Sequence, residues 1–266
     1  MTYGAARVAL VTGAARGIGA ATVDVLCRQG YNVLALDVAA GTEHKFSGVD
    51  YPMADGDELD AVAATFPDQI HAVRADVCDR DALHLAAAEA VEVFGHLDAV
   101  VAAAAVIAGG TPAWETDVDV WTSLWEIDVL GVVNTAAATI PYLLKSPTGA
   151  GRFVSIASAA AHQGLFSLSA YCATKHAVVG FTKGLSADLV GTGVTACSVS
   201  PGSTDTAMLA ATSSIYGLDN PAELISHCLI RRVLKPAEIA EVIANCCAPS
   251  AAALNGSVVR ADGGFA

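Results

Sequence analysis

The chain has 266 residues and a formal net charge of −13, and 54% of its residues are hydrophobic. This length fits a single α/β domain over residues 1–266. The negative charge would repel a nucleic-acid backbone. The richest apolar stretch is too short to cross a bilayer, and the N-terminus lacks the pattern of a secretion signal. We therefore expect a cytoplasmic protein that binds neither nucleic acid nor membrane.

The cysteines form no CxxC pair, which indicates reduced, buried thiols and predicts neither a disulfide nor a metal site. The seven residues concerned are Cys27, Cys78, Cys172, Cys197, Cys228, Cys246 and Cys247.

Short β-rich runs alternate with longer helical patterns along the chain. The expected strands are Arg7–Val11, Tyr31–Leu36, Ile70–Ala75, Ala99–Ala103, Arg152–Ile156, Val194–Val199 and Ser257–Ala261. Seven strands separated by helices predict a doubly wound parallel sheet with helices on both faces, which is a Rossmann-type α/β domain. In such a sheet, ligands bind at the carboxyl ends of the strands.

A glycine-rich turn follows the first strand and precedes an Ala-rich helix that ends near Arg28. The turn contains Gly13, Arg16, Gly17, Ile18 and Gly19. Glycines allow the backbone to approach a pyrophosphate closely, and the helix directs its free N–H groups toward the phosphates. The turn therefore predicts a dinucleotide site.

Asp37 lies at the end of the second expected strand. A carboxylate there accepts hydrogen bonds from the ribose hydroxyls of NAD and repels the additional phosphate of NADP. Arg16 offers a cation that could attract this phosphate, but it lies in the glycine turn. The sequence therefore favours NAD over NADP.

Tyr171 and Lys175 are four residues apart in the expected helix Ser169–Leu189, which places them on one face. An ammonium favours the ionised form of a nearby phenol, so Lys175 is expected to lower the pKa of Tyr171. Such a phenol can exchange a proton with an alcohol oxygen. Ser158, at the end of the fifth expected strand, can hold the same oxygen.

These three residues and the glycine turn resemble the short-chain dehydrogenase/reductase family over essentially the whole chain. The resemblance implies hydride transfer, with Tyr171 as acid/base, Ser158 orienting the oxygen, and Lys175 also holding the nicotinamide ribose. It also implies that Tyr171 and Lys175 border the cofactor. Further cofactor-binding positions implied by the resemblance are Asp76 and Val77 for the adenine, Ala103, and Pro201, Gly202, Thr204 and Thr206 for the nicotinamide.

Two positions depart from the family pattern. The family's catalytic asparagine, which holds a water of the proton relay, is replaced by Asp128. We include Asp128 among the catalytic candidates, because its carboxylate can keep the water contact while adding a charge near Lys175. The usual Asn-Asn-Ala-Gly segment after the fourth strand is Ala102–Ala105, so Ala103 stands at a cofactor-binding position without a polar side chain.

The connection from Asp37 to Asp76 is long for an α/β unit, and we expect an insertion over residues 38–57 beside the adenosine, followed by a helix beginning near Asp57. With other motifs, it resembles the mycofactocin-coupled, carveol-dehydrogenase-like subgroup. Members are thought to retain NAD, which a peptide-derived redox carrier reoxidises. The quoted motifs are Tyr51-Pro52, Ala108–Glu115, Lys175–Gly180, Pro201–Thr204 and Met208–Ala211.

Residues 207–232 contain many apolar side chains and are expected to form a lid over an apolar substrate. The opposite wall is expected to contain Trp114, Ala160, His162, Leu165 and Phe166, with His162 as a wall or surface residue rather than a catalytic one. An apolar secondary alcohol or ketone is the expected substrate.

Two alternatives remain at this point. One is a 3-oxoacyl-carrier reductase of the same fold with freely exchanging cofactor, which the charge of −13 disfavours for an acidic carrier. The other is a non-catalytic, NAD-sensing regulator, which usually lacks the tyrosine or the lysine. The family resemblance also suggests a homotetramer built through helices around residues 115–145 and 170–190.

Overall fold

The computed structural model describes residues 6–42, 46–219, 223–225 and 228–265. Within them the chain forms a seven-stranded, all-parallel sheet with the order β3-β2-β1-β4-β5-β6-β7. The strands are β1 (Val8–Thr12), β2 (Asn32–Asp37), β3 (Ile70–Arg74), β4 (Ala99–Ala102), β5 (Arg152–Ile156), β6 (Thr195–Pro201) and β7 (Val258–Ala261). All seven expected strands are confirmed, with ends that differ by no more than two residues.

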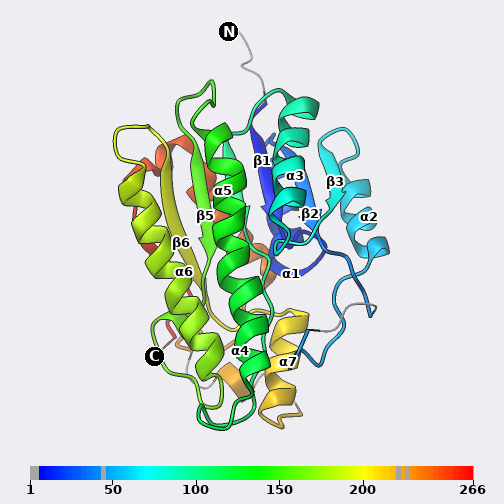
Figure 1. Ribbon diagram of the computed structural model, residues 1–266, viewed down its shortest axis with the longest axis vertical. Helices are drawn as coiled ribbons and strands as arrows, with labels where there is room; N and C mark the ends of the chain where they lie inside the picture. The colour runs from blue at the N-terminus through cyan, green and yellow to red at the C-terminus, as the bar shows by residue number, and fades with distance from the viewer. Residues whose placement is uncertain (1–5, 43–45, 220–222, 226–227, 266) are drawn as a thin grey trace.

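Helices cover both faces of the sheet (Figure 1). The helices are α1 (Gly17–Arg28), α2 (Gly56–Thr65), α3 (Arg80–Phe94), α4 (Val118–Leu124), α5 (Gly131–Leu143), α6 (Ser169–Asp188), α7 (Ala207–Ile215) and α8 (Pro236–Cys247). A π-helix, η1 (Trp125–Leu130), joins α4 to α5, and the 3₁₀-helices include η2 (Ala159–Ala161) and η4 (Pro249–Leu254). The expected single Rossmann-type domain is confirmed.

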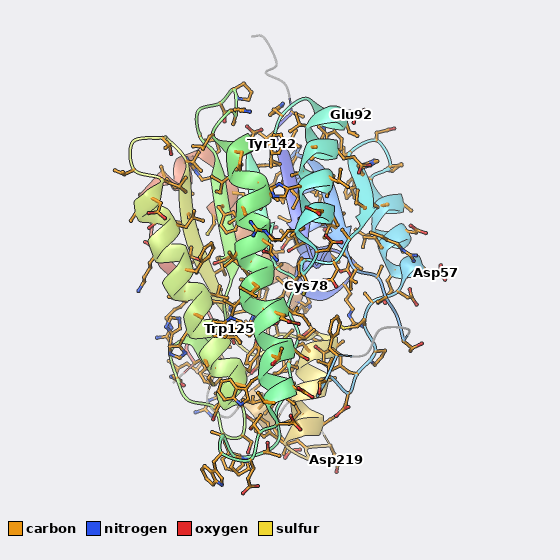
Figure 2. All side chains as sticks on the ribbon, in the orientation of Figure 1. Asp57, Cys78, Glu92, Trp125, Tyr142 and Asp219 are labelled. Atoms are coloured by element: carbon orange, nitrogen blue, oxygen red, sulfur yellow. The ribbon has the colours of Figure 1, made fainter. Side chains whose placement is uncertain are left out.

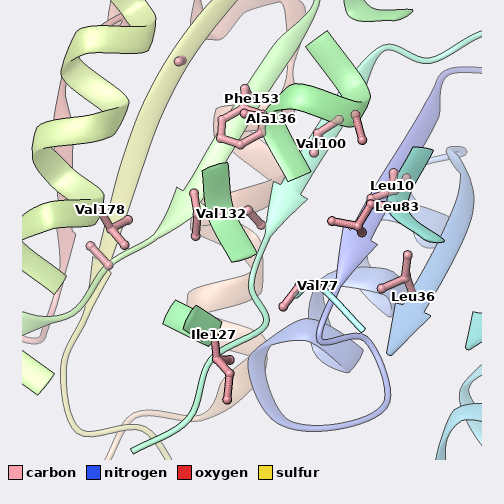
Figure 3. Packing of buried hydrophobic residues seen from close by; sticks show 14 of the residues in the cluster. Leu10, Leu36, Val77, Leu83, Val100, Ile127, Val132, Ala136, Phe153 and Val178 are labelled. Atoms are coloured by element: carbon pink, nitrogen blue, oxygen red, sulfur yellow. The ribbon is translucent and has the colours of Figure 1, made fainter. Parts of the chain in front are cut away.

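The strands alternate their side chains between two cores, because successive residues of a strand point to opposite faces. In β1, Val8 and Leu10 pack on the side of α3, α5 and α6, whereas Ala9 and Val11 pack on the side of α1 and α8. Figure 3 shows the first core, where Leu10 lies near Leu83 of α3. Because both faces are buried, the strands consist almost entirely of apolar residues.

The chain reverses its direction of travel across the sheet after β3, because β4 pairs with β1 rather than with β3. This is the switch point at which doubly wound sheets bind ligands, outside the carboxyl ends of the strands. Figure 2 marks the two ends of the molecule: Glu92 and Tyr142 lie at the amino end of the sheet, and Asp219 lies beyond α7 at the opposite end.

A buried carboxylate holds the amino end of the sheet together. Asp98, just before β4, is fully buried and accepts a hydrogen bond from the backbone N–H of Val8 at 3.0 Å. It also binds the hydroxyls of Ser146 and Thr148 and the ring Nε2 of His96. These hydrogen bonds compensate for burying the charge of Asp98. Asp98 lies at the opposite end of the sheet from the carboxyl ends of the strands.

Six of the seven cysteines are buried, Cys78 is half-buried, and all seven are free thiols. The expected burial is therefore found at six of the seven positions. Among the helices in the described part of the chain, none has the length and apolarity needed to cross a membrane.

Candidate active site

A single cavity at the carboxyl ends of the strands brings together the expected site residues. Ser158 and all the expected cofactor-binding residues line it: Gly13, Arg16, Gly17, Ile18, Gly19, Asp37, Asp76, Val77, Ala103, Tyr171, Lys175, Pro201, Gly202, Thr204 and Thr206. Asp128 lies outside the lining, behind Lys175. Residues far apart in the sequence therefore form one site.

The glycine turn is as tight as a dinucleotide site requires. Gly13 has φ +67°, and a Cβ at this position would lie 2.7 Å from the Cα of Ala104. A Cβ at Gly19 would lie 1.9 Å from the carbonyl oxygen of Gly13. Only glycine fits these two positions without a backbone shift.

Thr12 connects the glycine turn to the segment after β4, a role that its sequence context did not predict. Its Oγ1 accepts hydrogen bonds from the N–H groups of Ala103 at 3.1 Å and Ala104 at 3.2 Å. Thr12 therefore positions the alanines that replace the family's Asn-Asn-Ala-Gly segment. A threonine at the end of β1, just before Gly13, was the available sequence signal.

The N-terminus of α1 faces the cavity with Arg16 as its N-cap, and no side chain caps it. Uncapped N–H groups and the helix dipole suit a negatively charged group. With the closely packed glycines, these residues fit the pyrophosphate of NAD.

Asp37 ends β2 and is held in a fixed orientation. Its Oδ2 accepts a hydrogen bond from the N–H of Ala15 at 3.0 Å, and its Oδ1 accepts one from the N–H of Ala39 at 2.9 Å. The carboxylate is 8% exposed and lines the cavity. Its remaining lone pairs can therefore accept hydrogen bonds from ribose hydroxyls.

Tyr171 and Lys175 lie one turn apart on the buried face of α6, with 6% and 2% of their surfaces exposed. The Nζ of Lys175 is 5.4 Å from the centre of the Tyr171 ring. Ser158 follows β5 and caps η2, with its Oγ accepting a hydrogen bond from the N–H of Ala160 at 3.2 Å. The Ser158 hydroxyl also interacts with that of Tyr171.

The pKa of Tyr171 is raised above its ordinary value of 10.0, which differs from the expected lowering. Burial has the largest effect and disfavours the phenolate. Lys175 and Ser158 lower the pKa as expected, but Asp128 raises it again. The positive charge of Lys175 alone therefore does not determine the ionisation of Tyr171.

Asp128 belongs to η1 and is fully buried. Its Oδ1 accepts a hydrogen bond from the N–H of Val106 at 2.8 Å, and its Oδ2 lies 3.1 Å from the Nζ of Lys175. Asp128 thus forms an ion pair with Lys175.

The comparisons with known proteins agree with this geometry. The family model for short chain dehydrogenase matches residues 7–216. A cis-4-hydroxycyclohexanecarboxylate dehydrogenase of Sinomonas cyclohexanicum is 32% identical over 98% of this chain and 97% of its own length. The chain belongs to the short-chain dehydrogenase family. It is an oxidoreductase that acts on CH–OH groups.

Solved structures of short-chain dehydrogenases have the same fold. A short chain dehydrogenase of Mycobacterium paratuberculosis bound to NAD is 28% identical, with a TM-score of 0.87 and 97% coverage of both chains. The carveol dehydrogenase of Mycobacterium avium in complex with NAD has a TM-score of 0.91 at 24% identity, with 98% coverage of both chains. This second match concerns the fold alone.

In this short-chain dehydrogenase, the segment between β2 and α2 covers part of the cavity. Residues Phe46, Tyr51, Met53 and Ala54 line the cavity. The Tyr51 hydroxyl accepts a hydrogen bond from the N–H of Ile107 at 3.1 Å. Residues 43–45 of the expected insertion lie outside the described part of the chain.

Arg16 of the glycine turn contacts this same segment. Its guanidinium donates a hydrogen bond to the carbonyl of Pro52, and its Cζ lies 6.0 Å from the centre of the Tyr51 ring. Together with the bond between Tyr51 and Ile107, these contacts form a clasp over the cavity. The clasp consists of Arg16, Tyr51, Pro52 and Ile107.

Only part of the expected lid borders the cavity among the described residues. Met208, Leu209 and Thr212 of α7 line it, and the Tyr171 hydroxyl lies 3.9 Å from the Sδ of Met208. The other apolar residues expected in the lid are absent from the described lining, namely Ile215, Tyr216, Leu218, Leu224 and Ile225. Residues 220–222 and 226–227 of the expected lid lie outside the described ranges.

The expected opposite wall is largely wrong. Leu165 lines the cavity, but Trp114 and Phe166 point into solvent with 83% and 82% exposure. The ring of His162 faces Ser200, with Nε2 3.0 Å from its Oγ, and Ala160 is buried in the first core. These four residues are absent from the described lining. Their order along the chain did not determine which way each side chain points.

Proposed function

We propose that this enzyme transfers a hydride between NAD and an apolar secondary alcohol or its ketone. The observation that carries the proposal is the placement of Ser158, Tyr171 and Lys175 beside the glycine turn in one cavity. NAD, when bound, supplies the carbon that accepts or releases the hydride. An assay of nicotinamide absorbance with cyclic secondary alcohols and ketones tests the proposal, and no transfer with any of them would contradict it.

The side chains divide the proton chemistry between them. Tyr171 gives a proton to the substrate oxygen in reduction and takes it in oxidation, because its hydroxyl faces the cavity. Ser158 orients the same oxygen, and Lys175 faces the nicotinamide ribose. The presence of all three argues against a non-catalytic regulator, and the charge of −13 argues against an acidic acyl carrier as substrate.

The substrate end of the cavity supports an apolar substrate. The thioether of Met208 lies 3.9 Å from the Tyr171 hydroxyl, and many other lining side chains are apolar. Such a wall favours a hydrocarbon frame over a charged one, because burying an unpaired charge is costly. The apolar lining residues include Val106, Ile107, Leu165, Leu168, Met208, Leu209 and Phe265.

NAD is the cofactor that we propose in preference to NADP. Asp37 presents a buried carboxylate where the ribose would bind, and Arg16 is engaged with Pro52 rather than free to bind a phosphate. We further propose that the clasp holds NAD so that it does not exchange, and that a redox carrier such as mycofactocin reoxidises it.

Asp37→Ala should weaken NAD binding and reduce the preference for NAD over NADP by roughly tenfold, equivalent to about 1.4 kcal/mol. The variant loses both the ribose acceptor and the charge that repels a phosphate. Calorimetry on protein freed of nucleotide measures both affinities. Asp57→Ala is the control, since Asp57 is an exposed carboxylate on α2. An unchanged affinity ratio in Asp37→Ala would assign the preference to another residue.

We also propose a homotetramer assembled through the helices around residues 115–145 and 170–190. Apolar side chains are exposed on this layer, including Val118 at 71%, Trp125 at 44% and Leu130 at 41%. Figure 2 shows Trp125 on the layer that contains α5 and α6. Light scattering should give the mass of four chains, and a monomeric mass would rule out the assembly.

A further inference from the structure

The contact between Asp128 and Lys175 places two opposite charges in a buried region behind the cavity wall. Asp128 is fully buried and Lys175 is 2% exposed, and their charged atoms are 3.1 Å apart. Charges in such a place act on their neighbours with little screening by salt or solvent. A change of charge at residue 128 therefore affects the ionisation of the groups around it.

Several elements bring titratable groups near this pair. Tyr171 and Lys175 come from α6, and Glu126 shares η1 with Asp128. Two further groups feel the charge of Asp128: Tyr51 in the segment after β2 and Cys78 in the segment after β3. Arg16 lies beside Tyr51, and Asp76 acts on Cys78. Of these groups, Lys175 is the cation that acts on Tyr171, and Asp128 opposes it directly.

We propose that Asp128 is a positioning residue that cancels the charge of Lys175 and so keeps the Tyr171 hydroxyl protonated, which makes alcohol oxidation depend on a raised pH. This inference rests on the proposed function. In reduction, the carbonyl carbon gains a hydride from reduced NAD, and the oxygen gains the proton of the Tyr171 hydroxyl. The phenolate left behind recovers a proton from water. Alcohol oxidation needs the phenolate at the start of the reaction, and its rate is therefore expected to rise with pH.

The shifts of the neighbouring groups support this arrangement. Burial and Asp128 together raise the pKa of Tyr171 against the opposing effects of Lys175 and Ser158. Burial alone would lower the pKa of Lys175, but Asp128 and Tyr171 raise it above its ordinary value, so the lysine remains an ammonium. Both directions favour the acid form of the phenol and the cationic form of the lysine, while burial raises the pKa of Asp128 itself against the lowering effects of Lys175 and the N–H of Val106.

Asp128→Asn tests the proposal, because it keeps the shape and an acceptor for the N–H of Val106 but removes the charge. The pH midpoint of alcohol oxidation should fall by roughly one unit. Below the midpoint, the oxidation rate should therefore rise about tenfold. Glu126→Gln is the matched control, since Glu126 is an exposed carboxylate of the same π-helix and should leave the midpoint unchanged. A purely structural role for Asp128 predicts slower reactions in both directions with the same midpoint, which would overturn the proposal.

A spectral titration tests the same point without turnover. The difference in phenolate absorbance between the intact protein and Tyr171→Phe reports the ionisation of Tyr171. As the pH is raised, this difference should appear only above the ordinary tyrosine pKa of 10.0. The same difference in the Asp128→Asn background should appear at lower pH. Equal titration midpoints for Tyr171 in the intact protein and in the Asp128→Asn background would overturn the proposal. If Asp128→Asn fails to fold, a Tyr171 midpoint below 10.0 in the intact protein would overturn it. A shifted titration without hydride transfer would instead contradict the proposed function and leave the role of Asp128 intact.

Discussion

Tyr171→Phe should abolish measurable ketone reduction, a loss of about 10²–10⁴-fold, while the protein still binds NAD. The substitution removes only the hydroxyl that transfers the proton and preserves the ring in its buried place on α6. Steady-state kinetics measure the loss, and mass spectrometry of the native protein measures the bound nucleotide.

Tyr142→Phe provides the control for this substitution. Tyr142 lies near the end of α5 at the amino end of the sheet, away from the cavity (Figure 2). The control should react at the normal rate. A Tyr171→Phe variant with a rate near that of the unmodified protein would assign the acid/base role to another group.

The purified protein should contain bound NAD that free NAD does not replace. The clasp ties the segment between β2 and α2 to the glycine turn and to the segment after β4 at the cavity, and such a cover slows dissociation more than it alters hydride transfer. Given an apolar secondary alcohol in mildly alkaline buffer, the protein should reduce its NAD once and then stall despite excess free NAD. An artificial electron acceptor that reaches the nicotinamide should restart the reaction.

Two variants test whether the clasp causes this retention. Deletion of residues 43–56 should restore exchange, but it also removes Asp55, whose side chain caps α2. Tyr51→Ala is the milder change, since it removes the hydroxyl that binds Ile107 and the ring beside Arg16. Trp114→Ala is the control, because this exposed residue is outside the described cavity lining. Many turnovers by the intact protein, with free NADH accumulating, would show that NAD exchanges and that the segment is only a long loop.

The sequence predicted the features that depend on short patterns of neighbouring residues, such as apolar runs and the spacing of two residues in a helix. The strands were recognisable because both faces of the sheet are buried and each strand is a short apolar run. The positions of Asp37 and Ser158 followed from strand ends, because the carboxyl ends of parallel strands meet at one edge. The Tyr171–Lys175 spacing was enough to place both residues on one helical face.

The features that the sequence could not predict depend on side-chain direction and on long-range contacts. Trp114 and Phe166 lie in loops, where no periodicity indicates whether a side chain points inward, and both point into solvent. The partners of Asp98 come from segments up to 90 residues away. The raised pKa of Tyr171 results from several opposing effects, of which only the lysine is visible as a spacing in the sequence.

Because η1 is a π-helix, the position of Asp128 beside Lys175 depends on the number of residues in this segment as well as on their identity. A π-turn contains one more residue per turn than an α-helix of the same span. In η1 this wider turn buries Asp128 against Lys175 and leaves Trp125 and Leu130 on the surface. Loss of a single residue here would rewind the segment as an α-helix, so that α4 and α5 keep their faces while the residues inside η1 change direction. A relative with the same aspartate but one residue fewer would therefore place its carboxylate away from the lysine.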